Sequence, residues 1–290
     1  MTRAIHTVAV VGAGTMGHGV AQVAAMAGCA VTLIDTSTDL VARAIDRISG
    51  NLDGAVQRGK LSAEARAGAL SRLSPSTSVA DGARDADLVI EAVPEKLDLK
   101  IDLFRTLDDV VAQDTILATN TSSLSITSIQ RATRTPARVI GLHFFNPVHI
   151  NRLVEVVRGR DTADAVVASA LALAQRLDKE AVLVNDAPGF ATSRLGVLLG
   201  LEAIRMVEQN VASAADIDRA MELGYRHPMG PLRLTDLVGL DVRLDIARYL
   251  HDALGSDAFR PPALLEQMVA DGRLGKKSGS GFYEWGSNDP

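Results

Sequence analysis

The feature that restricts the fold most is a run of three glycines between a predicted strand and a predicted helix near the N-terminus. Residues 7–11 are apolar and mostly β-branched, which is typical of a buried strand. The run Gly12-Ala13-Gly14-Thr15-Met16-Gly17 follows at once, and residues 15–27 have the pattern of a helix. A second strand is predicted over residues 30–35. Strand, turn, helix and strand in so short a segment form a βαβ unit, which predicts a parallel sheet.

The same alternation continues to about residue 185, apart from a helical-hairpin insertion over about 39–73. Strands that alternate with helices are typical of an α/β fold, so we expect a doubly wound Rossmann-type sheet. The further strands are predicted over residues 86–93, 115–119, 138–143, 153–157 and 181–184, and the further helices over 98–111 and 163–177.

The composition changes at residues 185–189, beyond which strand-like runs are scarce. We therefore expect two domains: residues 1–185 form the sheet domain, and residues 186–290 form an all-helical C-terminal domain. Ser213 is a plausible N-cap, with Asp216 as its partner. We expect the last residues, 286–290, to be disordered. The C-terminal helices are predicted over residues 190–209, 213–223, 231–250 and 262–270.

The glycine run has the pattern G-x-G-x-x-G in the context that a dinucleotide site requires, after a strand and before a helix. Gly12 permits the tight turn, Gly14 lets the backbone approach a pyrophosphate, and Gly17 lets the helix lie close to the sheet. The pyrophosphate is expected at the helix N-terminus, beside Thr15 and Met16. The run by itself does not distinguish NAD from FAD.

Asp35 ends the second strand, eighteen residues after Gly17. A carboxylate at this position accepts hydrogen bonds from the ribose hydroxyls of NAD and repels the 2′-phosphate of NADP. Asp35 has an alternative role as the cap of the next helix, but Thr36 and Ser37 can serve that purpose themselves. We therefore expect NAD as the cofactor.

His143 lies at the C-terminal end of a predicted strand, the end that faces the ligand crevice of a parallel sheet. Glu155 lies twelve residues further on, in an apolar strand that can lie beside the first. A glutamate in such a strand is costly unless it is paired. The run Asn120-Thr121-Ser122-Ser123 brings polar side chains to the same crevice, where we expect Asn120 to contact the cofactor.

These residues suit the oxidation of an alcohol. Loss of a hydride from a carbinol carbon requires a base for the hydroxyl proton, and imidazole titrates near neutral pH. A carboxylate on the other ring nitrogen fixes the tautomer and stabilises the imidazolium. The pattern predicts His143 as the base and Glu155 as its partner.

In these motifs the chain resembles the 3-hydroxyacyl-CoA dehydrogenase family, most of all its short, single-function bacterial 3-hydroxybutyryl-CoA dehydrogenases. The resemblance covers nearly the whole chain, in order and with similar spacing. It rests on the run from Gly12 to Gly17, Val89-Ile90-Glu91-Ala92-Val93-Pro94-Glu95, Asn120-Thr121-Ser122-Ser123, His143-Phe144-Phe145-Asn146-Pro147, Pro188-Gly189-Phe190, Pro228-Met229-Gly230-Pro231 and Gly275-Lys276-Lys277.

The resemblance implies NAD-dependent oxidation of an (S)-3-hydroxyacyl-CoA, with His143 and Glu155 as the catalytic pair. Ser122 matches the serine that contacts the reacting oxygen and the nicotinamide. Residues that match the lining of the cofactor site are Glu95, Lys100 and Asn146. Residues that fall where the family binds the nucleotide part of coenzyme A are Asn51, Arg58 and Lys60, although polar residues on a helix commonly form only a solvated face. The resemblance also implies a homodimer through the helical domain.

One residue departs from the family pattern. The family carries an asparagine before the arginine of a Phe-x-x-Asn-Arg run, whereas this chain has Ser193 before Arg194. Serine is shorter, but it still hydrogen-bonds to a substrate directly or through water. The change is compatible with a larger acyl group, a different thioester carrier or lower activity.

Three other functions are alternatives to 3-hydroxyacyl-CoA oxidation. A 3-hydroxyacid dehydrogenase with a catalytic lysine is disfavoured, because residues 185–210 contain no lysine and arginine stays protonated. A dehydrogenase for a carrier-protein thioester or a free hydroxy acid stays open, and Ser193 favours keeping it. A non-catalytic NAD-binding relative also stays open, because a fold does not guarantee a function.

Composition excludes several partners. The formal net charge is −5 and the sequence has no basic stripe, so nucleic acid is not expected. The six histidines have no metal-ligand spacing, so no metal is expected. The single cysteine, Cys29, forms no intrachain disulfide, which fits a reducing compartment. No signal peptide or apolar run long enough for a membrane span is apparent, so we expect a cytoplasmic protein.

Overall fold

The computed structural model describes residues 4–286, so most of the segment expected to be disordered, 287–290, lies outside the described residues. The chain divides into two compact units, Met1–Ala187 and Pro188–Pro290. Within residues 4–286, no helix has both the length and the apolar character that crossing a membrane requires.

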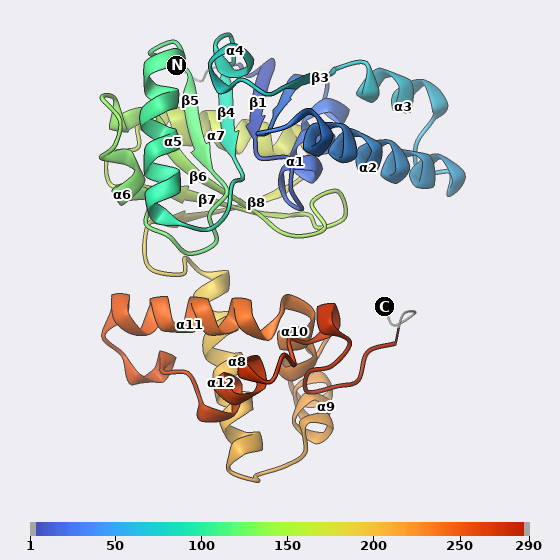
Figure 1. Ribbon diagram of the computed structural model, residues 1–290, viewed down its shortest axis with the longest axis vertical. Helices are drawn as coiled ribbons and strands as arrows, with labels where there is room; N and C mark the ends of the chain where they lie inside the picture. The colour runs from blue at the N-terminus through green and yellow to red at the C-terminus, as the bar shows by residue number, and fades with distance from the viewer. Residues whose placement is uncertain (1–3, 287–290) are drawn as a thin grey trace. The chain divides into compact units, whose positions relative to one another are not determined.

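The N-terminal unit contains one eight-stranded sheet in the order β3-β2-β1-β4-β5-β6-β7-β8, which confirms the doubly wound α/β fold (Figure 1). Strands β1 to β6 run parallel, and β7 runs antiparallel to β6. The strands are β1 (Thr7–Val11), β2 (Ala30–Ile34), β3 (Leu73–Ser76), β4 (Leu88–Glu91), β5 (Ile116–Thr119), β6 (Val139–Phe144), β7 (Leu153–Arg158) and β8 (Glu180–Asn185).

Helices cover both faces of the sheet, and α5 and α7 lie on opposite faces in Figure 1. Leu142 and Phe144 of β6 belong to a core cluster that includes side chains of α1 and α7. A Cβ on Gly141 would lie 2.9 Å from Ile126 of α6, so the alternate residues of β6 face the other side. The helices of this unit are α1 (Gly17–Met26), α2 (Thr38–Gln57), α3 (Ala63–Leu70), α4 (Val79–Ala83), α5 (Leu97–Val110), α6 (Ile126–Gln130), η1 (Pro136–Arg138) and α7 (Asp164–Arg176).

Two predictions about the sheet were wrong. Leu73 was assigned to the helical insertion, but it begins β3, which pairs with β2 at the edge of the sheet. Pro75 obscured this strand in the sequence, since proline is tolerated in sheets mainly at edges. The sheet was also expected to be parallel throughout. The connection from β6 to β7, residues 145–152, is too short for a crossover of about a dozen or more residues, so β7 reverses direction.

The C-terminal unit is helical, as predicted, with one difference. The single helix predicted over 231–250 is broken at Gly239, whose φ of +106° is a conformation that L side chains rarely adopt. Ser213 caps α9 by accepting a hydrogen bond from the Asp216 amide, as expected. The helices are α8 (Thr192–Glu208), α9 (Ala214–Tyr225), α10 (Pro231–Val238), α11 (Leu240–Leu254), η2 (Asp257–Phe259), α12 (Ala263–Ala270) and η3 (Lys276–Ser278).

The segment after η3 is held to α10 by a buried carboxylate. Asp236 has no exposed surface and accepts hydrogen bonds at 2.9 Å from the amides of Phe282 and Tyr283 and from the indole of Trp285. The neighbouring Tyr283 hydroxyl donates to Asp218 at 2.7 Å. Two buried acids therefore fix the C-terminal segment against the helices.

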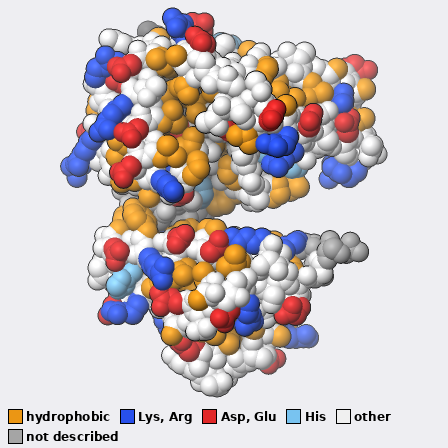
Figure 2. Space-filling view, viewed as in Figure 1, with side chains coloured by type: hydrophobic (Ala, Val, Ile, Leu, Met, Phe, Trp, Pro, Cys, Tyr) orange, Lys and Arg blue, Asp and Glu red, His pale blue; other side chains and the backbone are white. Residues whose placement is uncertain are grey.

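Large hydrophobic side chains remain exposed on the C-terminal unit, and Figure 2 shows part of this apolar surface. They lie on α8 to α11 and on the loop between α8 and α9. The residues are Leu195, Val211, Leu223, Tyr225, Leu234, Leu237, Val238 and Val242.

We predict that Asp236→Ala lowers the free energy of unfolding of the C-terminal unit by about 3 kcal/mol or more, because hydrogen bonds to a charged group contribute about 1.5–3 kcal/mol each. Urea denaturation followed by the fluorescence of Trp285, the single tryptophan, measures this loss. Asp245→Ala, at an exposed position of α11, is the control. Equal stability of the two variants would contradict the prediction.

Candidate active site

The glycine-rich turn connects β1 to α1 and leaves no room for side chains at two positions. A Cβ on Gly12 would lie 2.6 Å from the carbonyl oxygen of Ala92, and a Cβ on Gly17 would lie 1.6 Å from that of Gly12. A Cβ on Gly14 would meet nothing within 4 Å. Gly12 and Gly17 therefore allow strand and helix to approach, while the backbone at Gly14 stays open to a ligand.

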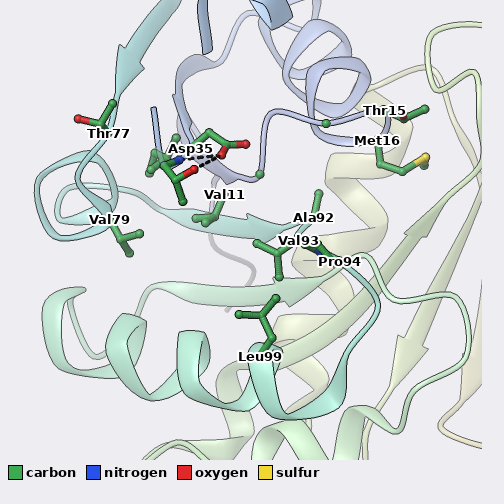
Figure 3. Close-up of a pocket in the computed structure, with 14 residues that line it drawn as sticks. Val11, Thr15, Met16, Asp35, Thr77, Val79, Ala92, Val93, Pro94 and Leu99 are labelled. Atoms are coloured by element: carbon green, nitrogen blue, oxygen red, sulfur yellow. Dashed lines mark hydrogen bonds between the residues drawn. The ribbon is translucent and has the colours of Figure 1, made fainter. Parts of the chain in front are cut away.

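Asp35 faces this turn from the end of β2. Its carboxylate accepts hydrogen bonds at 2.7 Å from the amides of Ala13 and Thr36. Asp35 lines a cavity of about 600 Å³, and Figure 3 shows its side chain at the edge of this cavity. The cavity suits the adenosine half of NAD, because an anchored carboxylate is available for ribose hydroxyls. It is lined by Val11, Gly12, Gly14, Thr15, Met16, Ile34, Asp35, Thr36, Thr77, Val79, Ala92, Val93, Pro94 and Leu99.

A buried ion pair lies beneath the loop after β4. Lys100 of α5 is 1% exposed, and its ammonium lies 2.6 Å from Glu91 Oε1 and 3.3 Å from Glu95 Oε2. Glu91 has no exposed surface and also accepts hydrogen bonds at 2.7 Å from the Val93 amide and the Thr119 hydroxyl. Burial raises the pKa of Glu91, and the Lys100 charge opposes this rise. Lys100 therefore acts on the site indirectly, by holding Glu95.

Glu95 in turn holds the loop after β5. Its Oε1 accepts hydrogen bonds from the Thr121 hydroxyl at 2.5 Å, the Ser122 amide at 2.8 Å and the Ser122 hydroxyl at 3.2 Å. Asn120 Oδ1 accepts a hydrogen bond from the Phe144 amide at 2.9 Å. The loop that carries Ser122 is therefore fixed both to the end of β4 and to the end of β6.

The antiparallel register of β6 and β7 places His143 directly opposite Glu155. His143 Nδ1 lies 2.7 Å from Glu155 Oε2, and Glu155 has no exposed surface. The expectation that these strands are neighbours and that Glu155 is paired is confirmed. The His143 ring also packs against Phe145, with centroids 4.2 Å apart.

The other predicted site residues have the following places in the fold. Asn51 donates a hydrogen bond to Gln22 at 3.0 Å and so joins α2 to α1. Arg58 ends α2, and Lys60 lies in the following turn; both are exposed. Asn146 is exposed just beyond β6, and Ser193 lies in the first turn of α8 in the other unit.

Sequence reasoning gave Glu91 no role of its own, although it anchors Lys100. The signal was present, because Glu91 is a glutamate within an apolar strand, as Glu155 is. The partner of Glu91, Lys100, lies on the following helix, and no local pattern in the sequence indicates that the two side chains meet.

Comparison with known proteins agrees with this site. The model of the 3-hydroxyacyl-CoA dehydrogenase NAD binding domain matches residues 7–187, and that of the family's C-terminal domain matches residues 189–285. The chain therefore belongs to the 3-hydroxyacyl-CoA dehydrogenase family, which confirms the resemblance noted in the sequence. It is an NAD-dependent oxidoreductase.

Three relatives illustrate the similarity. A probable 3-hydroxybutyryl-CoA dehydrogenase of Bacillus subtilis is 43% identical over 97% of this chain and 98% of its own. The 3-hydroxyadipyl-CoA dehydrogenase of Escherichia coli is 45% identical over 97% of this chain and 59% of its own. The crystal structure of Mycobacterium tuberculosis FadB2 superposes with a TM-score of 0.94 at 45% identity, covering 98% of this chain and 100% of that one.

We predict that Lys100→Met lowers the free energy of unfolding by about 3–5 kcal/mol, because it leaves the buried Glu91 carboxylate without its cation. The double variant Glu91→Gln/Lys100→Met recovers part of this loss, because no uncompensated charge remains buried. Urea denaturation followed by circular dichroism compares the two proteins. A double variant no more stable than Lys100→Met would show that the pair does not act in this way.

Proposed function

We propose that the protein oxidises the 3-hydroxyl of an (S)-3-hydroxyacyl-CoA to a ketone with NAD, in a reversible reaction. The observation that carries the proposal is the His143–Glu155 pair at the C-terminal end of β6. Because β1, β4, β5 and β6 are parallel, this end lies on the same edge of the sheet as the glycine-rich turn. The names of the relatives include a short acyl group, 3-hydroxybutyryl, and a dicarboxylic one, 3-hydroxyadipyl. We take a short acyl chain as the first candidate.

In this proposal His143 is the general base. Oxidation removes a proton from the 3-hydroxyl and a hydride from C3. The chemistry that NAD supplies when bound is acceptance of the hydride. His143 Nδ1 is held by Glu155, so Nε2 takes the hydroxyl proton. The Glu155 carboxylate orients the ring and stabilises the imidazolium, which returns the proton in the reverse reaction.

Ser122 and its supports orient the reacting groups. We assign to the Ser122 hydroxyl a hydrogen bond to the reacting oxygen, as the family resemblance implies. Glu95 fixes the Ser122 backbone and hydroxyl, and Lys100 holds Glu95. Asn120 and Asn146 lie at the ends of β5 and β6, where we assign them to the nicotinamide side. Asp35 takes the ribose hydroxyls at the other end of the cofactor.

The remaining predicted residues are assigned to coenzyme A and the acyl group. Arg58 and Lys60 offer exposed positive charge for phosphate groups, and Asn51 lies on the same helical insertion. Ser193 faces the thioester or acyl part in this proposal. The helical unit then contributes to binding of the acyl group, whereas residues 1–185 bind the dinucleotide and, through the helical insertion, coenzyme A.

We also propose a cytoplasmic homodimer. The exposed hydrophobic side chains on the C-terminal unit support a contact between two copies through that unit. A single cysteine, buried at position 29, is consistent with a reducing compartment.

The first test is consumption of NADH by the pure protein with acetoacetyl-CoA. We predict that His143→Ala and Glu155→Gln each lower kcat by about 10²–10⁴-fold, because proton transfer and the correct imidazole tautomer are lost. His6→Ala, which changes an exposed histidine, is the matched control and keeps full turnover.

Retained NADH binding in the variants, measured by nucleotide fluorescence, shows that they are folded. Rapid turnover that survives in His143→Ala would refute the assigned base. Turnover of carrier-protein thioesters but not of coenzyme A thioesters would refute the assigned carrier.

A further inference from the structure

The C-terminal unit contains a buried arginine whose charge serves none of the roles described above. Arg243 lies on α11 and is 7% exposed. Helices α8 and α11 pack against each other, and a Cβ on Gly196 would lie 3.5 Å from Arg243 Nη1. The guanidinium therefore lies beside the space that Gly196 leaves on α8.

Arg243 differs from the other buried cations. Among residues 4–286, three lysine or arginine side chains are buried: Lys100, Arg138 and Arg243. Lys100 and Arg138 each have a carboxylate 2.6 Å away, on Glu91 and Asp108 respectively. The Nε atoms of Arg138 and Arg243 are both buried without a partner, but within the same described residues no hydrogen bond or ion pair engages any part of the Arg243 guanidinium.

The acids nearest to Arg243 along α11 do not neutralise it. Asp241 pairs with Lys277, with nitrogen and oxygen 2.5 Å apart, and Asp245 is exposed on another face of the helix. Burial lowers the pKa of Arg243 to about 10, so the group keeps its charge at neutral pH. A buried charge without a counter-ion is strongly unfavourable, and a bound anion would remove this penalty.

Arg243 is related to the acyl group through helix α8, which carries Ser193 and Gly196. Ser193 and Gly196 are three residues apart on α8 and therefore lie on the same side of the helix, about 4.5 Å apart along its axis. In the proposed function, on which this inference rests, Ser193 faces the acyl thioester. An anion beside Gly196 would thus lie about one helical turn from the group that Ser193 faces.

We propose that Arg243 binds a carboxylate at the far end of the acyl chain, so that the preferred substrates are coenzyme A thioesters of 3-hydroxy dicarboxylic acids. The guanidinium forms two parallel hydrogen bonds with a carboxylate, which matches its planar shape. Ser193, which is shorter than the family's asparagine, is compatible with this longer acyl group.

The test compares two substrates that differ only at the end of the chain, 3-hydroxyadipyl-CoA and 3-hydroxyhexanoyl-CoA. We predict that the wild type has a kcat/KM about 100-fold higher for the dicarboxylic substrate, because loss of a buried charge partner has an effect of this order. In Arg243→Met the dicarboxylic substrate loses about 100-fold and the hexanoyl substrate gains, which reverses the preference. Arg243→Lys keeps the charge and part of the preference.

The control variant is Arg248→Met, which removes an exposed arginine of the same helix, paired with Glu266. It is expected to keep the wild-type preference. Trp285 fluorescence shows whether each variant is folded. Equal kcat/KM of the two substrates in the wild type, or the same loss for both in Arg243→Met, would overturn the inference.

Binding separates this inference from the proposed function. Adipyl-CoA and hexanoyl-CoA have no 3-hydroxyl and cannot be oxidised, so calorimetry with them reports recognition alone. Tighter binding of adipyl-CoA that is lost in Arg243→Met supports the role of Arg243 even if no thioester is turned over. Good turnover of 3-hydroxyhexanoyl-CoA with no effect of Arg243 on adipyl-CoA binding refutes this role and leaves the proposed function standing.

Discussion

A carboxylate buried between two strands determines how the candidate site is arranged. Glu155 has no exposed surface, and its charge is tolerated inside the sheet because His143 lies at hydrogen-bonding distance. The two residues face each other only because β6 and β7 are antiparallel. That direction follows from the short connection over residues 145–152. The reversal of the chain after six parallel strands is therefore what gives the histidine its acidic partner.

A second buried carboxylate also requires a partner, beneath the loop after β4. Glu91 is held by Lys100, and Lys100 also reaches Glu95, which fixes the loop of Ser122. The two buried acids thus have different consequences. Glu155 is paired with an imidazole ring, whereas Glu91 is paired with a lysine that also contacts Glu95. Each buried carboxylate is stabilised by a partner on another element of the fold: Glu155 of β7 by His143 of β6, and Glu91 of β4 by Lys100 of α5.

Local patterns in the sequence sufficed to predict the glycine-rich turn, Asp35 and the pairing of His143 with Glu155. Each depends on the alternation of strands and helices, which is visible without knowledge of distant contacts. The edge strand β3 was missed because Pro75 disguises it, and the break at Gly239 was missed because one glycine in an apolar helical pattern is weak evidence of an end. The reversal of β7 and the partner of Glu91 depend on tertiary packing.

The burial of Arg243 could not be predicted from the sequence, for a different reason. An arginine in an amphipathic helix is ordinarily an exposed residue, and only the packing of α11 against α8 shows that this one is buried. Lys100 and Arg138 indicate how the fold treats a buried cation when its role is internal, since each is matched by a carboxylate of the same unit. A third buried cation without such a match, beside Gly196 of α8, is better explained by a ligand than by stability. A lone buried charge is costly to the fold, and a ligand carboxylate at the guanidinium would offset that cost.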